Sequence, residues 1–159
     1  MIEPTPTVGD RADRYFQEGY NCAQAVLRAV AESSGLECAQ CVPGVALAMG
    51  GGVGHAGYTC GAVTGAVMAL GLAVDRFGEG SLRSRKEEAY RLGGEFVADF
   101  TGEFGSPECC VLLGFSPSAP GAAERFQREQ VKQKKCTRYV RWAAEEAARL
   151  ADRIVGGER

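Results

Sequence analysis

The chain has 159 residues, enough for one domain with a substantial core and too few for two domains of usual size. It is 45% hydrophobic and 24% charged, and its formal net charge of −2 excludes the strongly basic surfaces that attract nucleic acid or acidic membranes. Residues 1–10 lack the regions of a secretory signal, and the apolar run at 61–74 is shorter than the ~20 residues of a membrane span. We therefore expect a cytoplasmic protein with no membrane insertion and no nucleic-acid partner.

The N-terminal part of the chain predicts a short tail and then a helix. Residues 1–9 carry two prolines and are expected to be a disordered lead-in to a single helical domain over 10–159. Asp10 can cap a first helix that runs to about Ser33. Cys22 lies at helical spacing from apolar residues of this segment, so it is expected on the inner face of that helix.

The next segment combines glycines with apolar residues. Residues 36–59 predict a short helix followed by a glycine-rich loop. A buried helix then runs from Thr59 to about Val74, because nearly every face of this stretch is apolar. Gly61 and Gly65 lie four residues apart in it, which leaves a flat stripe where another backbone can pack closely.

Two further helices carry clear start and stop signals. Ser81 or Ser84 begins a long amphipathic helix that Gly105 ends. Ser106 then acts as the N-cap of a short helix that stops at Gly114.

The C-terminal part predicts a loop over 115–121 and a last helix. That helix begins near Ala122 and has its clearest apolar periodicity between Cys136 and Val155. No stretch alternates apolar and polar residues long enough to predict a strand. The expected fold is all-α: a compact single-domain bundle of about five helices with a glycine-rich loop.

The chain holds seven cysteines, and in a reducing compartment this number favours ligands or reactive thiols over disulfides. Cys60 and Cys109 are expected in the first turns of helices, where the helix dipole lowers the pKa of a thiol. Cys136 follows two lysines that favour the same ionised form, and Cys22 adds a fourth sulfur from the first helix. A simpler interpretation treats each cysteine as a small buried apolar side chain.

Several blocks of the sequence match a known pattern. Gly-Tyr-Asn-Cys-Ala-Gln-Ala-Val stands at 19–26, and the other matching blocks are 50–52, 60–68, 104–106 with Cys109, 112–114 and 135–136. Together they resemble the redox-active four-cysteine proteins with the signature C_GCAxxG_C_C. This chain reads Cys-Gly-Ala at 60–62, where the signature reads Gly-Cys-Ala. The resemblance implies a redox role and a functional set of Cys22, Cys60, Cys109 and Cys136.

The other three cysteines lie outside that pattern. Cys38 and Cys41 form a C-x-x-C pair, but the chain has neither the βαβ context of a thioredoxin-like motif nor the second pair of a zinc ribbon. The pair is interpreted as accessory thiols. Cys110 should point about 100° away from Cys109 on the helix and serve in packing.

The glycine loop contains two further candidates. Residues 52–57 match G-x-G-x-x-G, but no strand precedes or follows them, so a dinucleotide site is rejected. We expect this loop to approach the cysteine centre and to donate N–H groups to sulfur, and we place Gly61 at the cofactor. His55 is either a fifth ligand or proton donor, or simply a solvated side chain.

Four mechanisms follow from this cysteine set. The first is electron transfer by an iron–sulfur cluster, most simply [2Fe–2S], with an unidentified redox partner protein. The others are a cofactor-free thiol–disulfide protein, a structural zinc site and a plain helical interaction domain. Four cysteines that lie 27 or more residues apart favour the cluster, since a dithiol needs two and structural zinc ligands usually come in close pairs. A redox protein is thus expected rather than a substrate-converting enzyme, and the sequence also admits a homo-oligomer.

Overall fold

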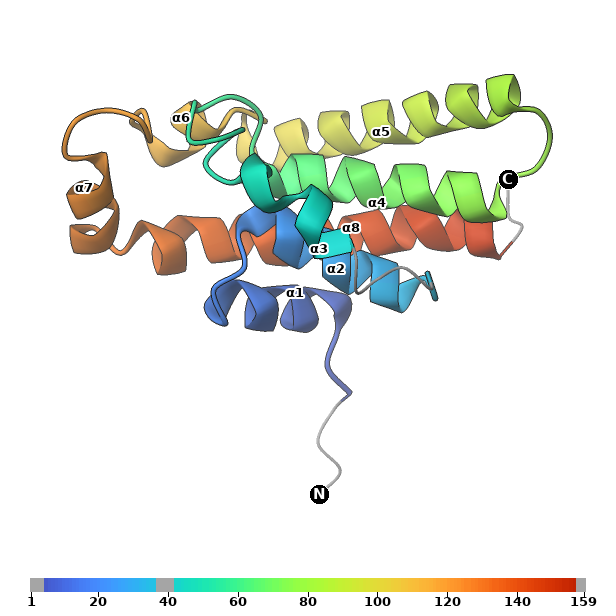
Figure 1. The fold of residues 1–159 in the computed structure, drawn as a ribbon, viewed down its shortest axis with the longest axis horizontal. Coiled ribbons are helices and arrows are strands. Elements are labelled where there is room, and N and C mark those ends of the chain that lie inside the picture. Colours follow the sequence, from blue (N-terminus) through green and yellow to red (C-terminus); the bar gives the residue numbers. More distant parts are fainter. Residues whose placement is uncertain (1–4, 37–41, 157–159) are drawn as a thin grey trace.

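The computed structural model describes residues 5–36 and 42–156, and these form an all-α fold without a strand. Figure 1 shows the arrangement of its elements. They are α1 (Val8–Gln17), α2 (Cys22–Ser33), α3 (Val42–Val45), the 3₁₀ turn η1 (Leu47–Met49), α4 (Gly61–Phe77), α5 (Leu82–Phe104), α6 (Cys109–Leu113), α7 (Ala122–Arg128), the π-helical segment η2 (Lys132–Cys136) and α8 (Thr137–Val155). The predicted fold class is therefore confirmed.

The central element is α4, which packs against α2, α5 and α8. The long helices α4, α5 and α8 run along the long axis of the molecule, and α1 and α2 lie along one side of them (Figure 1). The short helices α6 and α7 and the glycine loop gather at one end. Within the described residues, none of the helices combines the length and the apolar character that a membrane crossing requires.

The first expected helix is in fact two helices, and this corrects the sequence interpretation. Thr7, not Asp10, is the N-cap of α1, so Val8 and Gly9 already belong to the helix. At Gly19 the backbone adopts a positive φ of 110°, which ends α1, and Asn21 then caps α2 through a box with Gln24. Cys22 is consequently the first residue of α2 rather than a residue in the middle of a longer helix.

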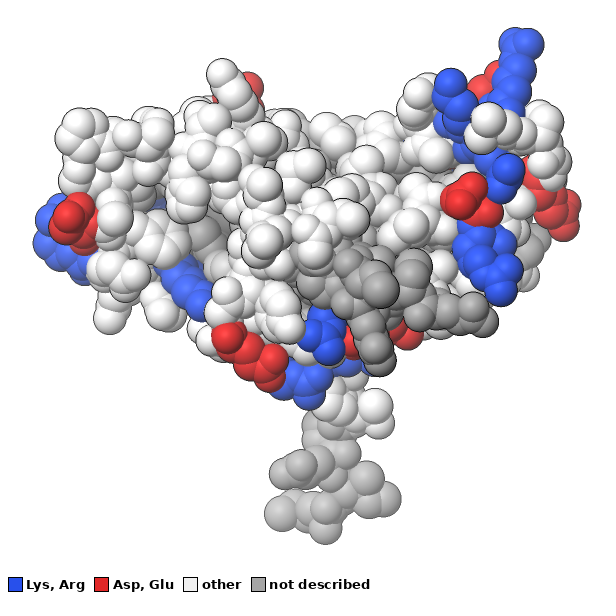
Figure 2. Space-filling model, viewed as in Figure 1, with Lys and Arg blue, Asp and Glu red and all other residues white. Residues whose placement is uncertain are grey.

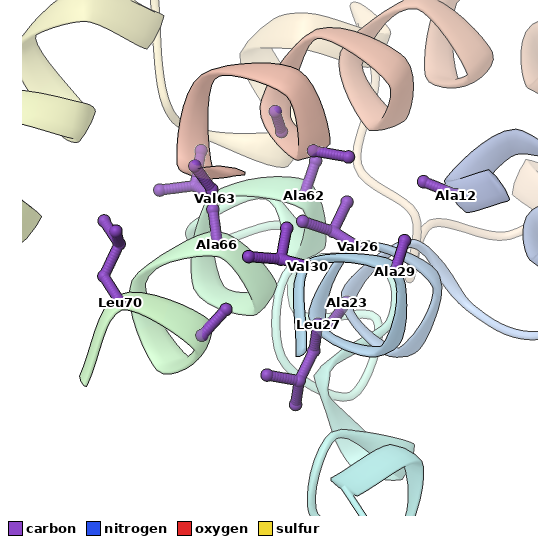
Figure 3. Close-up of a cluster of buried hydrophobic side chains, with 14 of the residues drawn as sticks. Ala12, Ala23, Val26, Leu27, Ala29, Val30, Ala62, Val63, Ala66 and Leu70 are labelled. Atoms are coloured by element: carbon purple, nitrogen blue, oxygen red, sulfur yellow. The ribbon is translucent and has the colours of Figure 1, made fainter. Parts of the chain in front are cut away.

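The crossing of α2 and α4 confirms the predicted close approach of backbones. An added Cβ at Gly65 would lie 2.5 Å from the carbonyl oxygen of Ala23, so only glycine fits there. Figure 3 shows small side chains of α2 and α4 facing each other across this contact. Among them Val26, Ala62 and Ala66 are fully buried. The crossing therefore brings the starts of α2 and α4 together.

On the other side of α4, aromatic side chains join α5 to α8. Phe100 lies 4.7 Å from Phe104 and 5.7 Å from Trp142, measured between ring centroids. Of the two expected starts of α5, Ser81 is the N-cap, and Gly105 ends the helix in the left-handed conformation as predicted.

The expected last helix is also divided. Its first part is the separate helix α7, and the π-helical segment η2 then leads into α8, so the molecule has more helices than the five expected. The loop at 115–121 and the stop of α6 at Gly114 are confirmed.

Candidate redox centre

All four cysteines of the expected set line one cavity of about 650 Å³. They come from four separate elements: Cys22 begins α2, Cys60 is the N-cap of α4, Cys109 begins α6 and Cys136 ends η2. Three helices thus direct their N-terminal ends toward the same space, where their dipoles favour negative charge. The fold assembles this set only after the chain has packed.

Hydrogen-bond donors surround the Cys22 sulfur, and they favour its thiolate form. The hydrogen bond from the Cys60 thiol is the main cause that lowers the pKa of Cys22 from 9.0 to about 7. The backbone N–H groups of Gly51 and Ala23 lower this pKa further, while burial opposes them. The donation from Gly51 confirms that the glycine loop brings its N–H groups to sulfur.

Backbone hydrogen bonds hold Cys60 and Cys109 side by side. The N–H of Cys60 donates to the carbonyl of Pro107 at 2.8 Å, and the N–H of Cys109 donates to the carbonyl of Tyr58 at 2.7 Å. These bonds flank an isolated antiparallel bridge between Thr59 and Glu108. The segment before α4 therefore positions the segment before α6.

Two glycines leave room for the sulfurs and their neighbours. A Cβ at Gly61 would overlap the Cys22 sulfur, so this position, expected at the cofactor, lies directly against one of the four cysteines. Gly52 has a φ of 70°, and a Cβ there would lie 2.7 Å from the Cβ of Cys109. A side chain at either position would push a cysteine away from the cavity.

The predicted low pKa of Cys60 and Cys109 is wrong. The hydrogen bond that Cys60 donates to Cys22, together with burial, raises the pKa of Cys60. Burial raises the pKa of Cys109 to about 12, and it does the same for Cys136 despite the nearby Lys135. Desolvation outweighs the helix dipole and the lysine charge, because these thiols lie in apolar surroundings. The thiol with the lowered pKa is Cys22.

The remaining candidates lie in different places. His55 lines the cavity, and its side chain is exposed. Cys110 does not line the cavity; it packs against Gly57, where an added Cβ would lie 3.1 Å from the Cβ of Cys110. Cys38 and Cys41 lie outside the described residues.

Sequence reasoning missed two residues that shape the site. Asn21 caps α2 just before Cys22, and its side-chain amide also donates to the carbonyls of Ala46 and Leu47. The signal was present, since an asparagine followed three residues later by a glutamine is a capping box. Gly51, which donates to Cys22, belonged to a run of glycines in which no pattern singled it out.

The cysteines within the described residues are free, and no three His, Cys, Asp or Glu side chains of these residues are grouped so that they could hold one metal ion. The arrangement instead offers one pair of hydrogen-bonded sulfurs and two further thiols around a shared space. Such a set can bind a multi-atom centre or exchange electrons as thiols.

Comparison with protein families gives a match over most of the chain. A family model described as "Putative redox-active protein (C_GCAxxG_C_C)" matches residues 20–150. No curated protein and no solved structure matches the chain. The matched residues contain Cys22, Cys60, Cys109 and Cys136 and cover most of the sequence. The chain therefore belongs to the C_GCAxxG_C_C family of redox-active proteins.

Proposed function

We propose that the protein transfers electrons through an iron–sulfur cluster, most simply [2Fe–2S], bound by Cys22, Cys60, Cys109 and Cys136. The observation that carries this proposal is that four cysteines from four elements line one cavity. A two-thiol reaction would leave two of them without a role. When bound, such a cluster gains and loses single electrons.

The surroundings of the four sulfurs fit a bound cluster. Backbone N–H groups of Gly51 and Ala23 point at Cys22, and the N–H of Ala62 acts on Cys60. Hydrogen bonds of this kind stabilise thiolate ligands and tune the potential of a cluster. Cys109 and Cys136, whose pKa values are raised to about 12, would release their protons to solvent when they bind iron.

The four cysteines lie 27 or more residues apart in the chain, whereas the ligands of structural zinc usually come in close pairs, and this supports a cluster. Zinc holds all its thiolates at about 2.3 Å, which draws the sulfurs of a site close together. No three candidate ligands among the described residues are gathered in that way. A cluster of several atoms would not require all four sulfurs to converge on one ion.

The test is to purify the full chain without oxygen and to reconstitute it with iron and sulfide. We expect both elements to be bound, together with charge-transfer absorption between about 320 and 600 nm. Replacing Cys22, Cys60, Cys109 or Cys136 by serine should abolish retention of iron. Cys110→Ser is the matched control, because Cys110 neighbours Cys109 in α6 but lies outside the cavity. A folded chain that binds no iron, or loss of iron in Cys110→Ser alone, would contradict the proposal.

A second candidate function rests on the Cys22–Cys60 hydrogen bond. A thiolate beside a thiol is the reduced form of a dithiol, and Cys22 has the lowered pKa of an attacking thiol. In that reaction the Cys22 thiolate would attack a disulfide of the partner, and Cys60 would then displace the partner to close a Cys22–Cys60 disulfide. The two electrons and the one proton of the thiolate–thiol pair would leave the partner as a thiolate and a thiol. The Cys→Ser series separates the two functions, because this reaction needs only these two cysteines and no iron.

We also propose a redox partner protein that docks near the glycine loop, and a reducing, cytoplasmic setting for the free thiols. Figure 2 shows few charged side chains over the middle of the face in view; they gather toward its ends and lower edge. Val45, Leu47 and Tyr58 are all more than two-thirds exposed, and they flank the loop that contacts Cys22. Exposed apolar side chains of this kind suit a short-lived contact with another protein.

A further inference from the structure

The cavity extends well beyond the cysteines. One part of its wall is formed by the starts of α2, α4 and α6 and the end of η2, where the sulfurs lie. The other part comes from α1, the end of α6, the following loop and α7, and it includes Phe16, Leu113, Phe115, Ala123 and Phe126. This second part, which we call the phenylalanine side, contains no cysteine.

The phenylalanine side suits an uncharged molecule. Among the described residues that line the cavity there is no lysine or arginine, and Glu124 is the one carboxylate. The cations that adjoin the cavity wall already have partners. Lys132 donates to the carbonyl of Phe16, Lys135 donates to the carbonyl of Leu113, and Arg125, which lies over the ring of Phe115, donates to Glu129. An anionic ligand would therefore be desolvated here without a partner, which is costly.

The same wall also suits flat rings. Aromatic side chains prefer to stack on other rings or to meet their edges. The whole cavity, cysteine side included, has a volume of about 650 Å³, within the usual range of roughly 300–1,000 Å³ for small-molecule sites, which are mostly apolar with a few polar groups. Gln127 supplies an amide group at the cavity wall.

We propose that the phenylalanine side binds an uncharged, planar, mainly apolar molecule of about two fused rings, beside the cysteine centre. The site lies between α6 and α7, and it is formed by the protein alone. Its existence does not depend on a bound cluster. A ligand held there would share one cavity with the four cysteines.

The test uses two probes that differ only in charge. N-phenyl-1-naphthylamine is uncharged, and 1-anilinonaphthalene-8-sulfonate has the same rings with an added sulfonate. Each is titrated by calorimetry into the full, reduced chain without oxygen, before and after reconstitution with iron. We expect about one uncharged probe bound per chain, and binding of the sulfonate at least about tenfold weaker, because no cation meets it.

Substitutions locate the site. Ala123→Trp and Gln127→Trp each place an indole at the cavity wall from exposed positions of α7, and each should weaken binding of the uncharged probe at least about tenfold by occupying the space. Ala119→Trp is the matched control, because Ala119 is exposed in the preceding loop and does not line the cavity. Far-ultraviolet circular dichroism confirms that each variant is folded, and the two α7 variants serve as independent tests.

The outcomes separate this proposal from the proposed function. Equal binding of both probes, no saturable binding, or unchanged binding in the two α7 variants would overturn the site. If the chain retains iron but does not bind the probes as described, only the proposed binding site is refuted. If the chain never retains iron but binds the uncharged probe as described, the proposed binding site stands and the proposed cluster is refuted.

Discussion

The ionisation of Cys22 depends on atoms from three different segments of the chain. Its own helix supplies the N–H of Ala23, the glycine loop supplies Gly51, and the start of α4 supplies the thiol of Cys60. Cys109 and Cys136 have no comparable set of donors, and burial raises the pKa of each to about 12. A position at the start of a helix is therefore not enough to lower the pKa of a thiol here. Several hydrogen-bond donors must also converge on the sulfur.

This difference predicts a sharp contrast in reactivity in the metal-free chain. The thiolate is the reactive form, and it is present above the pKa. Alkylation of Cys22 should therefore rise as the pH increases through about 7, whereas Cys109 and Cys136 should react only toward pH 12. Mass-spectrometric mapping of modified peptides against pH measures this. Removing the Cys60 donor by Cys60→Ala should move the Cys22 profile to higher pH. If Cys109 reacts before Cys22, the assignment of the thiolate is wrong.

The sequence was enough to predict which four cysteines line the cavity, but it was not enough to predict the pKa values of their thiols. Their identity follows from a resemblance spread along the chain, which requires no knowledge of packing. The pKa of a thiol depends on how many polar atoms and how much apolar material surround it, and this is a property of the packed molecule. A helix close to Cys109 could be predicted from Ser106 and Pro107, although the predicted N-cap Ser106 is wrong, since Glu108 is the N-cap of α6. The burial that raises the pKa of Cys109 could not be predicted.

At the level of the helices, the contact between α2 and α4 fixes the distance between two cysteine-bearing helix starts. Gly65 lies against the backbone of Ala23, one residue after Cys22, and Gly61 lies against Cys22 itself. The two glycines are one turn apart on α4. Any change that separates these helices would therefore also separate Cys22 from Cys60.

Gly65→Ala is expected to destabilise the fold by about 1–3 kcal/mol, because the new methyl group would overlap the Ala23 backbone. Gly71→Ala is the matched control in the same helix. A Cβ at Gly71 meets nothing within 4 Å, so the higher helix propensity of alanine should leave stability unchanged or raise it by up to about 1 kcal/mol. Urea unfolding of the metal-free chain gives both values. Equal effects of the two substitutions would mean that the helices are not in close contact at Gly65.

The all-helical character of the chain was predictable from the sequence. Helix boundaries were predictable where a single residue, such as a glycine, ends the helix. Gly105 and Gly114 end α5 and α6 in the left-handed conformation that glycine adopts easily. The break after α1 was missed because apolar periodicity continues across Gly19 into α2, although the cap at Asn21 was readable. Periodicity describes which face is buried, and it does not reveal a change of direction.

For the whole molecule, the four cysteines lie where two separate hydrophobic clusters adjoin. The cysteines belong to α2, α4, α6 and η2, and α6 and η2 lie toward one end of the fold (Figure 1). Most of the core lies in one cluster around α2, α4, α5 and α8. A second, small cluster holds Cys109, Leu113 and Val131 at the end that carries the cavity. A bound centre would link the two clusters.

Cofactor binding should therefore stabilise the chain, because a ligand that binds only the folded state raises the free energy of unfolding. We expect the reconstituted protein to melt at least about 5 °C above the metal-free form, given that roughly 1 kcal/mol corresponds to 2–4 °C at this size. Reconstituted Cys110→Ser should show the same rise, and Cys136→Ser should show none. Differential scanning calorimetry without oxygen measures the midpoints. An equal rise in Cys136→Ser would place the ligand elsewhere.

The cavity is the feature that sequence reasoning could not have reached. Phe115 lies in a segment read as a loop, and Phe126 lies in a segment read as the start of the last helix. Neither shows the pattern of a binding motif, and they face the cysteines only because α7 turns away from α8. Local sequence patterns predict individual helices. A cavity is the space that the packed helices leave unfilled, and it depends on how they are arranged.

The π-helical segment Lys132–Cys136 makes the position of α7 depend on the number of residues that precede α8. A π turn contains one residue more than an α turn, and each residue of an α-helix advances the chain by about 100° around the axis. Loss of one residue there, such as the exposed Gln133, would let a regular α-helix form while α8 stays fixed by its core contacts. Val131 and α7 would then turn about 100° away, and the phenylalanine side would open to solvent. A single-codon deletion would thus separate the two halves of the cavity while leaving all four cysteines in the gene.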